Sequence, residues 1–562
     1  MVLRVGLLVV ALAGLLLLQL VRGERLRQES LVDSPHAPQA AAHVRAGDTV
    51  HYTGAVLEYE PYITWTEEGG EAILMENVKV IAEYAAVAKE MGADILVAPE
   101  YGLHGLDMHV LVPDELLSFT QTVPDPRDLV VPCTATSDLG QATAIKALSC
   151  SALENQMYLV VDVSEKTPCD SSTSCPPSGS VLHNTQVVFD RNGTVIARLC
   201  WFESRLSEVR VVINFANTFT AIGLADSNLM YPTTIRSQLG SSYTPTSGKG
   251  SLAGSRDPSR VPLDSPQVCF DIAFGHPGLF NVDSRGVRDV AMSTAWVDIM
   301  PFLIAPSVQN GWSRGLGVNL LVSGHHRPER SKLGSGIYRG ASDLEHDYVY
   351  DVESGSRLIV SEVETVASVG GRRPPRRPSR SHGVAPPEAK RGSRLPRRDH
   401  LVYYDDLSNY TQVVLQKGDS QVVQHAEACH DDGLCCHLAY TPVGNLTYSL
   451  LAYSGVVVQG FGTYQIYAQI CTVVWCRSED VATCGQLGDL PGADAFPAFT
   501  IYADFAVDHV YPAMFTRDLA LVENDLYDYS CDDQRSCTIS TSAAVPELMT
   551  AGFYGRWYER DP

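Results

Sequence analysis

The feature that most constrains the fold of this chain is a change in the spacing of its apolar residues. Between residues 51 and 350, helical spacings alternate with short strand-like runs, whereas residues 401–562 contain strand-like runs almost throughout. Alternating helices and strands pack as layers in which helices cover the faces of a sheet, and successive strands form all-β domains. We therefore expect an α/β domain followed by a smaller β-rich domain.

Several elements can be assigned from local patterns. Apolar residues from Leu74 to Ala88 recur at spacings of three and four, which predicts a helix that ends at Gly92. The apolar runs 187–189 and 195–197 flank an Asn-Gly pair, which is typical of a hairpin turn. Further strands are expected at 95–98, 159–163, 268–272, 290–292, 318–322, 463–471 and 498–503.

Three segments interrupt this pattern. Residues 1–23 carry one apolar run, which is typical of a secretory signal peptide and is short for a bilayer-spanning helix of about 20 residues. Residues from about 224 to 266 are rich in Ser, Thr, Gly and Pro, which indicates an irregular insertion. Residues 367–400 are rich in Pro and Arg, which indicates a linker. The expected domains are 48–366 and 401–562, with no integral membrane span.

The chain has 14 cysteines, and cysteines behind a signal peptide indicate an oxidising compartment with several disulfides. We expect a secreted, extracellular glycoprotein with glycans at Asn192, Asn409 and Asn445, each of which begins an Asn-X-Thr sequence. Most cysteines lie in clusters that can pair locally, which leaves Cys200 and Cys269. These two either bridge each other or leave Cys269 as a free thiol, which would point to a function.

Charge and composition exclude some classes of partner. The formal net charge is -23, and a surface this acidic repels polyanions, so nucleic acid is not an expected partner. Cys429, Cys435, Cys436 and His437 have the side chains of a zinc site, but disulfides are the usual state of such cysteines in a secreted domain. We therefore expect no metal and no organic cofactor.

Glu100 and Cys269 are the strongest candidates for catalysis. Glu100 follows the strand expected at 95–98, Cys269 lies in the strand expected at 268–272, and α/β sheets gather their sites at the carboxyl ends of strands. In amide hydrolysis through a covalent intermediate, a carboxylate can take the thiol proton before the sulfur attacks the carbonyl. Spacing alone is weak evidence, because a buried Cys more often fills a core.

Motifs along the whole chain resemble the vanin and biotinidase branch of the nitrilase superfamily. They are found, in the family's order, at 98–105, 148–150, 166–170, 184–190, 269–272, 294–296, 334–338, 435–437 and 555–560. The resemblance implies an αββα nitrilase-type sandwich followed by the β-rich vanin-type domain. It also implies a Glu, Lys, Cys triad with Glu100 as general base and Cys269 as nucleophile, and a substrate pocket near Trp296 and His325.

The same resemblance implies a thiol-dependent amidase that acts on a small linear amide. Hydrolysis of pantetheine to pantothenate and cysteamine is the first choice. Hydrolysis of biotin amides is the alternative, because the loop Glu100–Gly105 looks slightly more like the biotinidase version.

The lysine of the family triad is missing. In the family it follows the strand that here ends at Arg198, and Trp201 stands at that position or beside it. Three explanations are open. Other donors, such as Arg198, Arg205 or backbone N–H groups beside Cys269, hold the oxyanion; the chain is a catalytically silent pseudoenzyme that binds a ligand; or this sequence departs from the natural protein between about residues 199 and 266.

Overall fold

The computed structural model describes most of the chain beyond residue 48. The ranges are 49–63, 69–105, 117–169, 179–202, 265–340, 346–366, 400–418, 420–442, 444–459, 464–487 and 494–562. All of them belong to one compact unit, residues 44–562. The expected signal peptide, Arg205, most of the insertion at about 224–266 and nearly all of the linker at 367–400 lie outside the described residues.

The first sheet has six strands in the order β12-β1-β2-β3-β4-β5. Strands β1, β2 and β3 run parallel, whereas β12, β4 and β5 pair antiparallel with their neighbours. The expected hairpin between β4 and β5 is confirmed, and Gly193 in its turn has a φ of 75°, a conformation that favours glycine. The strands are β12 (Arg357–Val366), β1 (Thr49–Glu58), β2 (Ile95–Val97), β3 (Tyr158–Pro168), β4 (Ser180–Phe189) and β5 (Val195–Phe202).

The second sheet has five strands in the order β11-β10-β9-β7-β6. Strands β6, β7 and β9 run parallel, and β10 and β11 are antiparallel. The expected strand at 268–272 is wrong beyond Val268, because residues Cys269–Ala273 form a 3-10 helix. The strands are β11 (Asp347–Val349), β10 (Ser335–Arg339), β9 (Asn319–Ser323), β7 (Asp289–Ser293) and β6 (Ser265–Val268).

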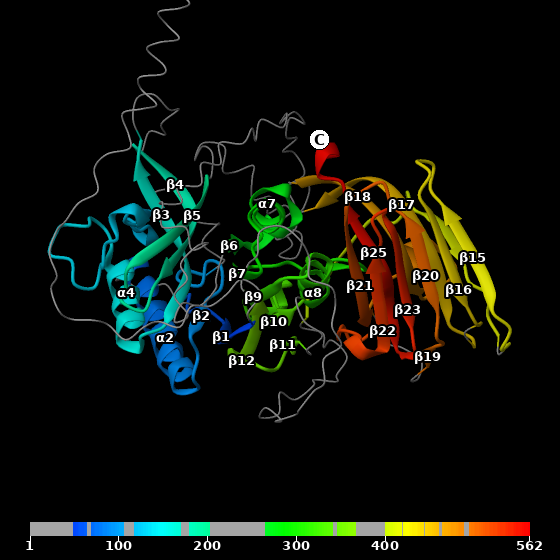
Figure 1. Ribbon diagram of the computed structural model, residues 1–562, viewed down its shortest axis with the longest axis horizontal. Coiled ribbons are helices and arrows are strands. Elements are labelled where there is room, and N and C mark those ends of the chain that lie inside the picture. The colour runs from blue at the N-terminus through cyan, green and yellow to red at the C-terminus, as the bar shows by residue number, and fades with distance from the viewer. Residues whose placement is uncertain are drawn as a thin grey trace, which may run out of the picture. The chain divides into compact units, whose positions relative to one another are not determined.

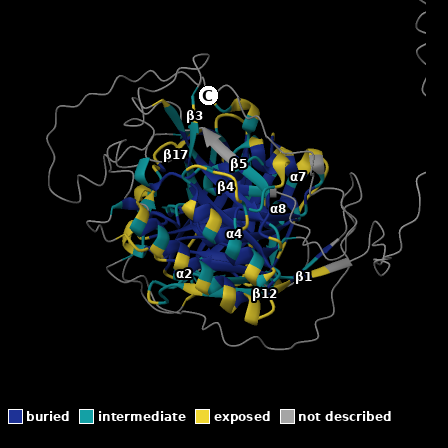
Figure 2. Cartoon of the chain, turned by 90° about the vertical axis from the view of Figure 1, so that its left-hand side faces the viewer, coloured by how far each residue is buried: buried dark blue, intermediate teal, exposed yellow. Residues whose placement is uncertain are grey.

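Helices cover the outer faces of both sheets. Helix α2 (Gly70–Glu90) matches the predicted helix, and it packs with α4 (Thr143–Asn155) on the first sheet (Figure 1). Their solvent-facing sides carry the exposed residues in Figure 2, with buried residues behind them. Helices α7 (Phe280–Arg285) and α8 (Ala305–Leu316) pack on the second sheet. An apolar layer that includes Val160 and Leu321 fills the space between the sheets, so the predicted αββα sandwich is confirmed.

Residues 400–562 are β-rich, and two five-stranded antiparallel sheets enclose a separate apolar core there. One sheet contains β14 (Thr411–Val414), β17 (Thr447–Gln459), β18 (Tyr464–Cys476), β25 (Leu548–Arg556) and β21 (His509–Thr516). The other contains β15 (Gln424–Cys429), β16 (Cys435–Tyr440), β20 (Thr500–Asp504), β23 (Ser536–Thr541) and β22 (Tyr527–Cys531). Short pairs join β13 (Tyr403–Tyr404) to β8 (Ile299–Met300) and β19 (Ala495–Phe496) to β24 (Val545–Pro546).

The cysteines pair locally, as the sequence predicts. The bonds are Cys133–Cys150, Cys429–Cys435, Cys436–Cys471, Cys476–Cys484 and Cys531–Cys537, and Cys169 also carries a disulfide. Cys269 is free, so the alternative of a bridge between Cys200 and Cys269 is wrong.

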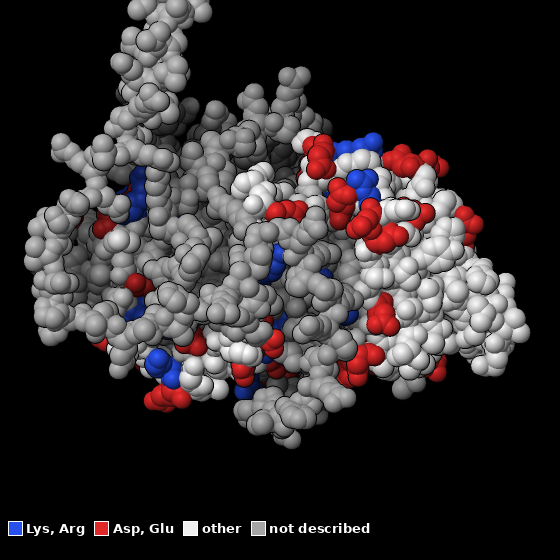
Figure 3. All heavy atoms as spheres, viewed as in Figure 1, with Lys and Arg blue, Asp and Glu red and all other residues white. Residues whose placement is uncertain are grey.

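The surface agrees with an acidic chain. Asp and Glu outnumber Lys and Arg on the coloured part of the face in Figure 3. The three sequon asparagines Asn192, Asn409 and Asn445 are exposed. Within the described ranges, no helix is both long and apolar enough to cross a membrane.

Candidate active site

Three strand ends meet at one edge of the sandwich. Ser293, the last residue of β7, donates a hydrogen bond from its hydroxyl to the carbonyl oxygen of Ala98, just beyond β2, at 2.7 Å. Strand β6 runs parallel to β7, with Val268 beside Ser293. Glu100 and Cys269 follow β2 and β6, so the structure brings these two predicted residues together.

Glu100 is 5% exposed, and every oxygen of the residue has a partner. The carboxylate accepts a hydrogen bond from the side-chain amide of Asn184 at 2.9 Å and another from the backbone N–H of Ala295 at 2.8 Å. The backbone carbonyl is bound by Nε2 of His325 at 2.5 Å. These contacts fix the direction of the carboxylate, which leaves little rotational freedom for it to lose during a reaction.

Cys269 is the first residue of the 3-10 helix and has a φ of 45°. This left-handed backbone conformation is uncommon for residues other than glycine, and strained residues of this kind cluster at functional sites as well as in turns. The turn forms because the Asp271 carboxylate accepts a hydrogen bond from the backbone N–H of Val268 at 2.8 Å. Cys269 is therefore placed on a sharp turn after a strand, and not within one.

The two candidate groups set each other's protonation. Burial raises the pKa of Glu100 to about 7, against the opposing hydrogen bond from the Cys269 thiol. Burial, and then the negative charge of Glu100, raise the pKa of Cys269 well above its usual value. The resting pair is therefore a thiol that donates its hydrogen bond to a carboxylate. A carboxylate with a pKa near 7 can accept and return a proton at neutral pH.

The pairing of β5 with β4 places Trp201, the residue at or beside the expected position of the lysine. Trp201 lies opposite Asn184, whose side chain contacts Glu100. Arg198, one of the donors that the sequence suggested, is held elsewhere: its Nε donates to the carboxylate of Glu165 at 2.8 Å, and Glu165 is 1% exposed. The expectation that Arg198 holds the oxyanion is wrong, because this ion pair occupies its guanidinium.

Trp296 and His325 take different places. Trp296 is buried, stacks on Phe270 with ring centroids 4.9 Å apart, and lines an apolar cavity of about 50 Å³ that neither Cys269 nor Glu100 lines. His325 contacts the backbone of Glu100 and does not line that cavity. Burial, together with the positive charge of Lys332, lowers the pKa of His325 to about 3, so its ring stays neutral.

Sequence reasoning missed three contributors to the site. Asn184 and the backbone N–H of Ala295 bind the Glu100 carboxylate, and the positive charge of Lys332 lowers the pKa of Glu100. Asn184 had one visible signal, since a polar residue at an inward position of a buried strand needs a partner. The other two depend on contacts between distant segments.

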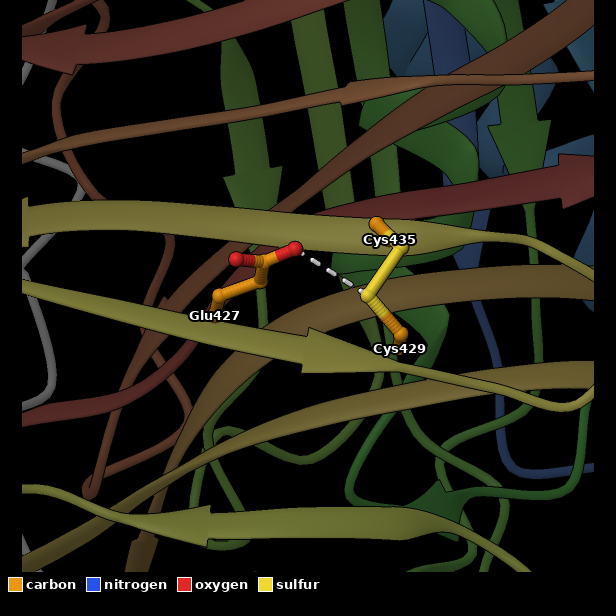
Figure 4. Close-up of side chains that lie close together, drawn as sticks. All are labelled: Glu427, Cys429 and Cys435. Atoms are coloured by element: carbon orange, nitrogen blue, oxygen red, sulfur yellow. Dashed lines mark hydrogen bonds between the residues drawn. A yellow bond between two sulfur atoms is a disulfide. The ribbon is translucent and has the colours of Figure 1, made fainter.

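The cysteine cluster in the β-rich region is no thiolate site. Figure 4 shows the Cys429–Cys435 disulfide with the Glu427 carboxylate directed toward it. Cys436 is bonded to Cys471. The zinc alternative for this cluster is wrong, because all three of its thiols are used in disulfides.

Comparison with known proteins adds two family matches. Residues 70–203 match the carbon-nitrogen hydrolase family, and residues 399–561 match the vanin C-terminal domain. Pantetheinase from Homo sapiens is 27% identical over 91% of this chain and 90% of its own length. Biotinidase from Bos taurus is 26% identical over 95% of both chains. A solved amidase from Nesterenkonia sp. covers 58% of this chain and 94% of its own length at 15% identity and a TM-score of 0.32.

The αββα sandwich and the matched hydrolase domain together define a carbon-nitrogen hydrolase. The hydrolase domain is followed by a vanin C-terminal domain, and pantetheinases and biotinidases align with nearly the whole chain. The chain belongs to the vanin and biotinidase branch of the nitrilase superfamily.

Proposed function

We propose that this protein hydrolyses pantetheine to pantothenate and cysteamine, with Cys269 as nucleophile and Glu100 as general base. The observation that carries the proposal is the contact between the Cys269 thiol and the buried carboxylate of Glu100. A nucleophile and a base within hydrogen-bond reach, with the base oriented by further groups, is the arrangement that covalent amide hydrolysis requires.

The reaction proceeds in two halves. Glu100 takes the thiol proton as the sulfur of Cys269 attacks the amide carbonyl, and it returns that proton to the departing amine. The products of this half are a thioester on Cys269 and free cysteamine. Glu100 then takes a proton from water, the resulting hydroxide attacks the thioester, and the proton returns to the sulfur as pantothenate leaves.

Biotin amides are the second candidate substrates. The biotinidase relative aligns over as much of the chain as the pantetheinases do, and at similar identity. Both substrate classes are linear amides of a carboxylic acid, so the same two residues serve either reaction.

The test is incubation of the purified protein with pantetheine and, separately, with biocytin. We expect cysteamine release, and an acyl adduct on Cys269 in the intact-protein mass spectrum, with pantetheine. Cys269→Ala should abolish both, and Glu100→Gln, which keeps the shape of the side chain, should slow adduct formation. Turnover of biocytin without turnover of pantetheine would show that biotin amides, and not pantetheine, are the substrates. An absence of adduct and product with both would indicate a silent pseudoenzyme.

We also propose that the protein is secreted. The disulfides need an oxidising compartment, and the sequon asparagines are exposed. Expression in a secreting eukaryotic cell should give protein in the medium with a mass that falls after N-glycosidase treatment. Retention of an unglycosylated protein in the cytosol would contradict this proposal.

A further inference from the structure

Thr294 is brought next to the nucleophile by the pairing of two strands. Strands β6 and β7 are parallel, and Val268 lies beside Ser293 at their carboxyl ends. Cys269 and Thr294 are the next residue on each strand, so they leave the sheet side by side. The backbone of Thr294 is fixed, since its N–H donates to the carbonyl of Ser323 at 2.8 Å.

The hydroxyl of Thr294 is buried but not committed to another group. The residue is 1% exposed, and Oγ1 has no well-aligned hydrogen-bond partner in the described part of the chain. A buried hydroxyl without a partner is destabilising, so its position calls for an explanation. It lies close enough to Cys269 to lower the pKa of the thiol, as does the backbone N–H of Ala295.

The proposed chemistry needs a donor at this place. When Glu100 removes the thiol proton, negative charge develops on a buried sulfur, and burial opposes that charge. The lysine that would supply positive charge in the family is absent, and Arg198 is bound to Glu165. A neutral O–H donor aimed at the sulfur stabilises the thiolate without adding a buried charge.

We propose that the Thr294 hydroxyl is a catalytic hydrogen-bond donor to the Cys269 sulfur, which stabilises the thiolate generated by Glu100. The inference rests on the proposed roles of Cys269 and Glu100. The proton balance is simple: the thiol proton moves to Glu100, while Thr294 keeps its own proton and shares it with the sulfur. No oxidant, metal or further reactant takes part.

Thr294→Val removes the donor and keeps the shape of the side chain, and Thr294→Ser keeps the donor. We measure the rate of Cys269 alkylation by iodoacetamide as a function of pH, which needs no substrate. In Thr294→Val the alkylation profile should shift to higher pH, and the turnover of pantetheine should fall roughly 10- to 100-fold, the range expected for a hydrogen bond to a charged group. Thr294→Ser should restore both.

Thr472→Val is the matched control. Thr472 lies in β18, is fully buried and also has an unpartnered hydroxyl, but it is remote from Cys269 in the sheet of the β-rich region. Its alkylation profile should equal that of the wild type. If Thr294→Val fails to fold, Thr294→Ala lacks the same hydroxyl and must show the same shift.

An unchanged alkylation profile in a folded Thr294 variant would overturn the inference. If the wild type instead hydrolyses neither amide while the profile still shifts, the proposed substrate fails and the role of Thr294 stands. The two failures are therefore separable, because alkylation reports on the thiol and product release reports on the substrate.

Discussion

At the scale of single residues, the proposed role of Glu100 makes its buried carboxyl the group that sets the pH dependence of the site. Its pKa is raised to about 7, chiefly by burial, while Asn184, Ala295 and Lys332 act in the opposite direction. Below that pKa the carboxyl is protonated and cannot accept the thiol proton. With Glu100 as general base, we therefore expect the site to be active on the alkaline side of this value and silent on the acid side.

We accordingly expect kcat/KM for pantetheine to fall as the pH drops through about 7, the pKa of Glu100. Initial rates between pH 5 and 9 in buffers of constant ionic strength check this. Asn184→Leu removes one donor to the carboxylate and should move the midpoint to higher pH, since the charged form loses a hydrogen bond. A midpoint near 4.5 in both proteins would contradict the role of Glu100.

At the scale of elements, the hairpin of β4 and β5 explains what the missing lysine changes. Trp201 lies opposite Asn184 in the register, so position 201 is adjacent to a residue that binds the base. We therefore expect position 201 to be the place where the lysine of the family triad would stand.

Trp201→Lys should raise the turnover of pantetheine at least about tenfold, because one oxyanion donor typically changes turnover by about 100- to 1,000-fold. Steady-state kinetics check this, with Phe202→Lys, one residue along β5, as the control that should give no gain. Equal effects of the two variants would show that added positive charge, and not its position, is responsible.

Some of these elements could be predicted from the sequence, and others could not. Helix α2 and strands β2, β7 and β9 were predictable, because their apolar spacing is decided locally. The 3-10 turn at Cys269–Ala273 was not predictable. The local sequence Val-Cys-Phe-Asp-Ile fits a strand, and the turn depends on the hydrogen bond from the N–H of Val268 to the Asp271 carboxylate. Glu100 and Cys269 were found through motifs, whereas Asn184 and Ala295 enter the site only through tertiary contacts.

At the scale of the whole molecule, residues of the β-rich region contact the turn that bears Cys269. Nε of Arg556, in β25, donates to the carbonyl of Ala273 at 3.0 Å, and the guanidinium is paired with Asp561 at 2.7 Å. Tyr464 in β18 stacks on Phe270, the neighbour of Cys269, at 5.2 Å. The turn that bears the thiol is therefore anchored by residues nearly 200 or more positions away in the chain.

Arg556→Gln should lower kcat roughly 10- to 100-fold with a smaller effect on KM, since small displacements of a reacting group cost this much. Arg517→Gln is the control, because Arg517 is equally buried but lies over the Trp475 ring within the β-rich core. Thermal unfolding of both variants corrects the rates for folded protein. Equal losses of kcat per folded molecule would indicate a general loss of stability.

The left-handed backbone at Cys269 has a consequence for how such proteins change over generations. A side chain at a φ of 45° lowers the stability of the folded state by about 1–2 kcal/mol relative to glycine. Selection for stability alone would therefore favour glycine over Cys269. A descendant released from the need to hydrolyse amides would become more stable by substituting glycine, in a single step that also ends its chemistry. We therefore expect glycine at position 269 in related proteins that no longer hydrolyse amides.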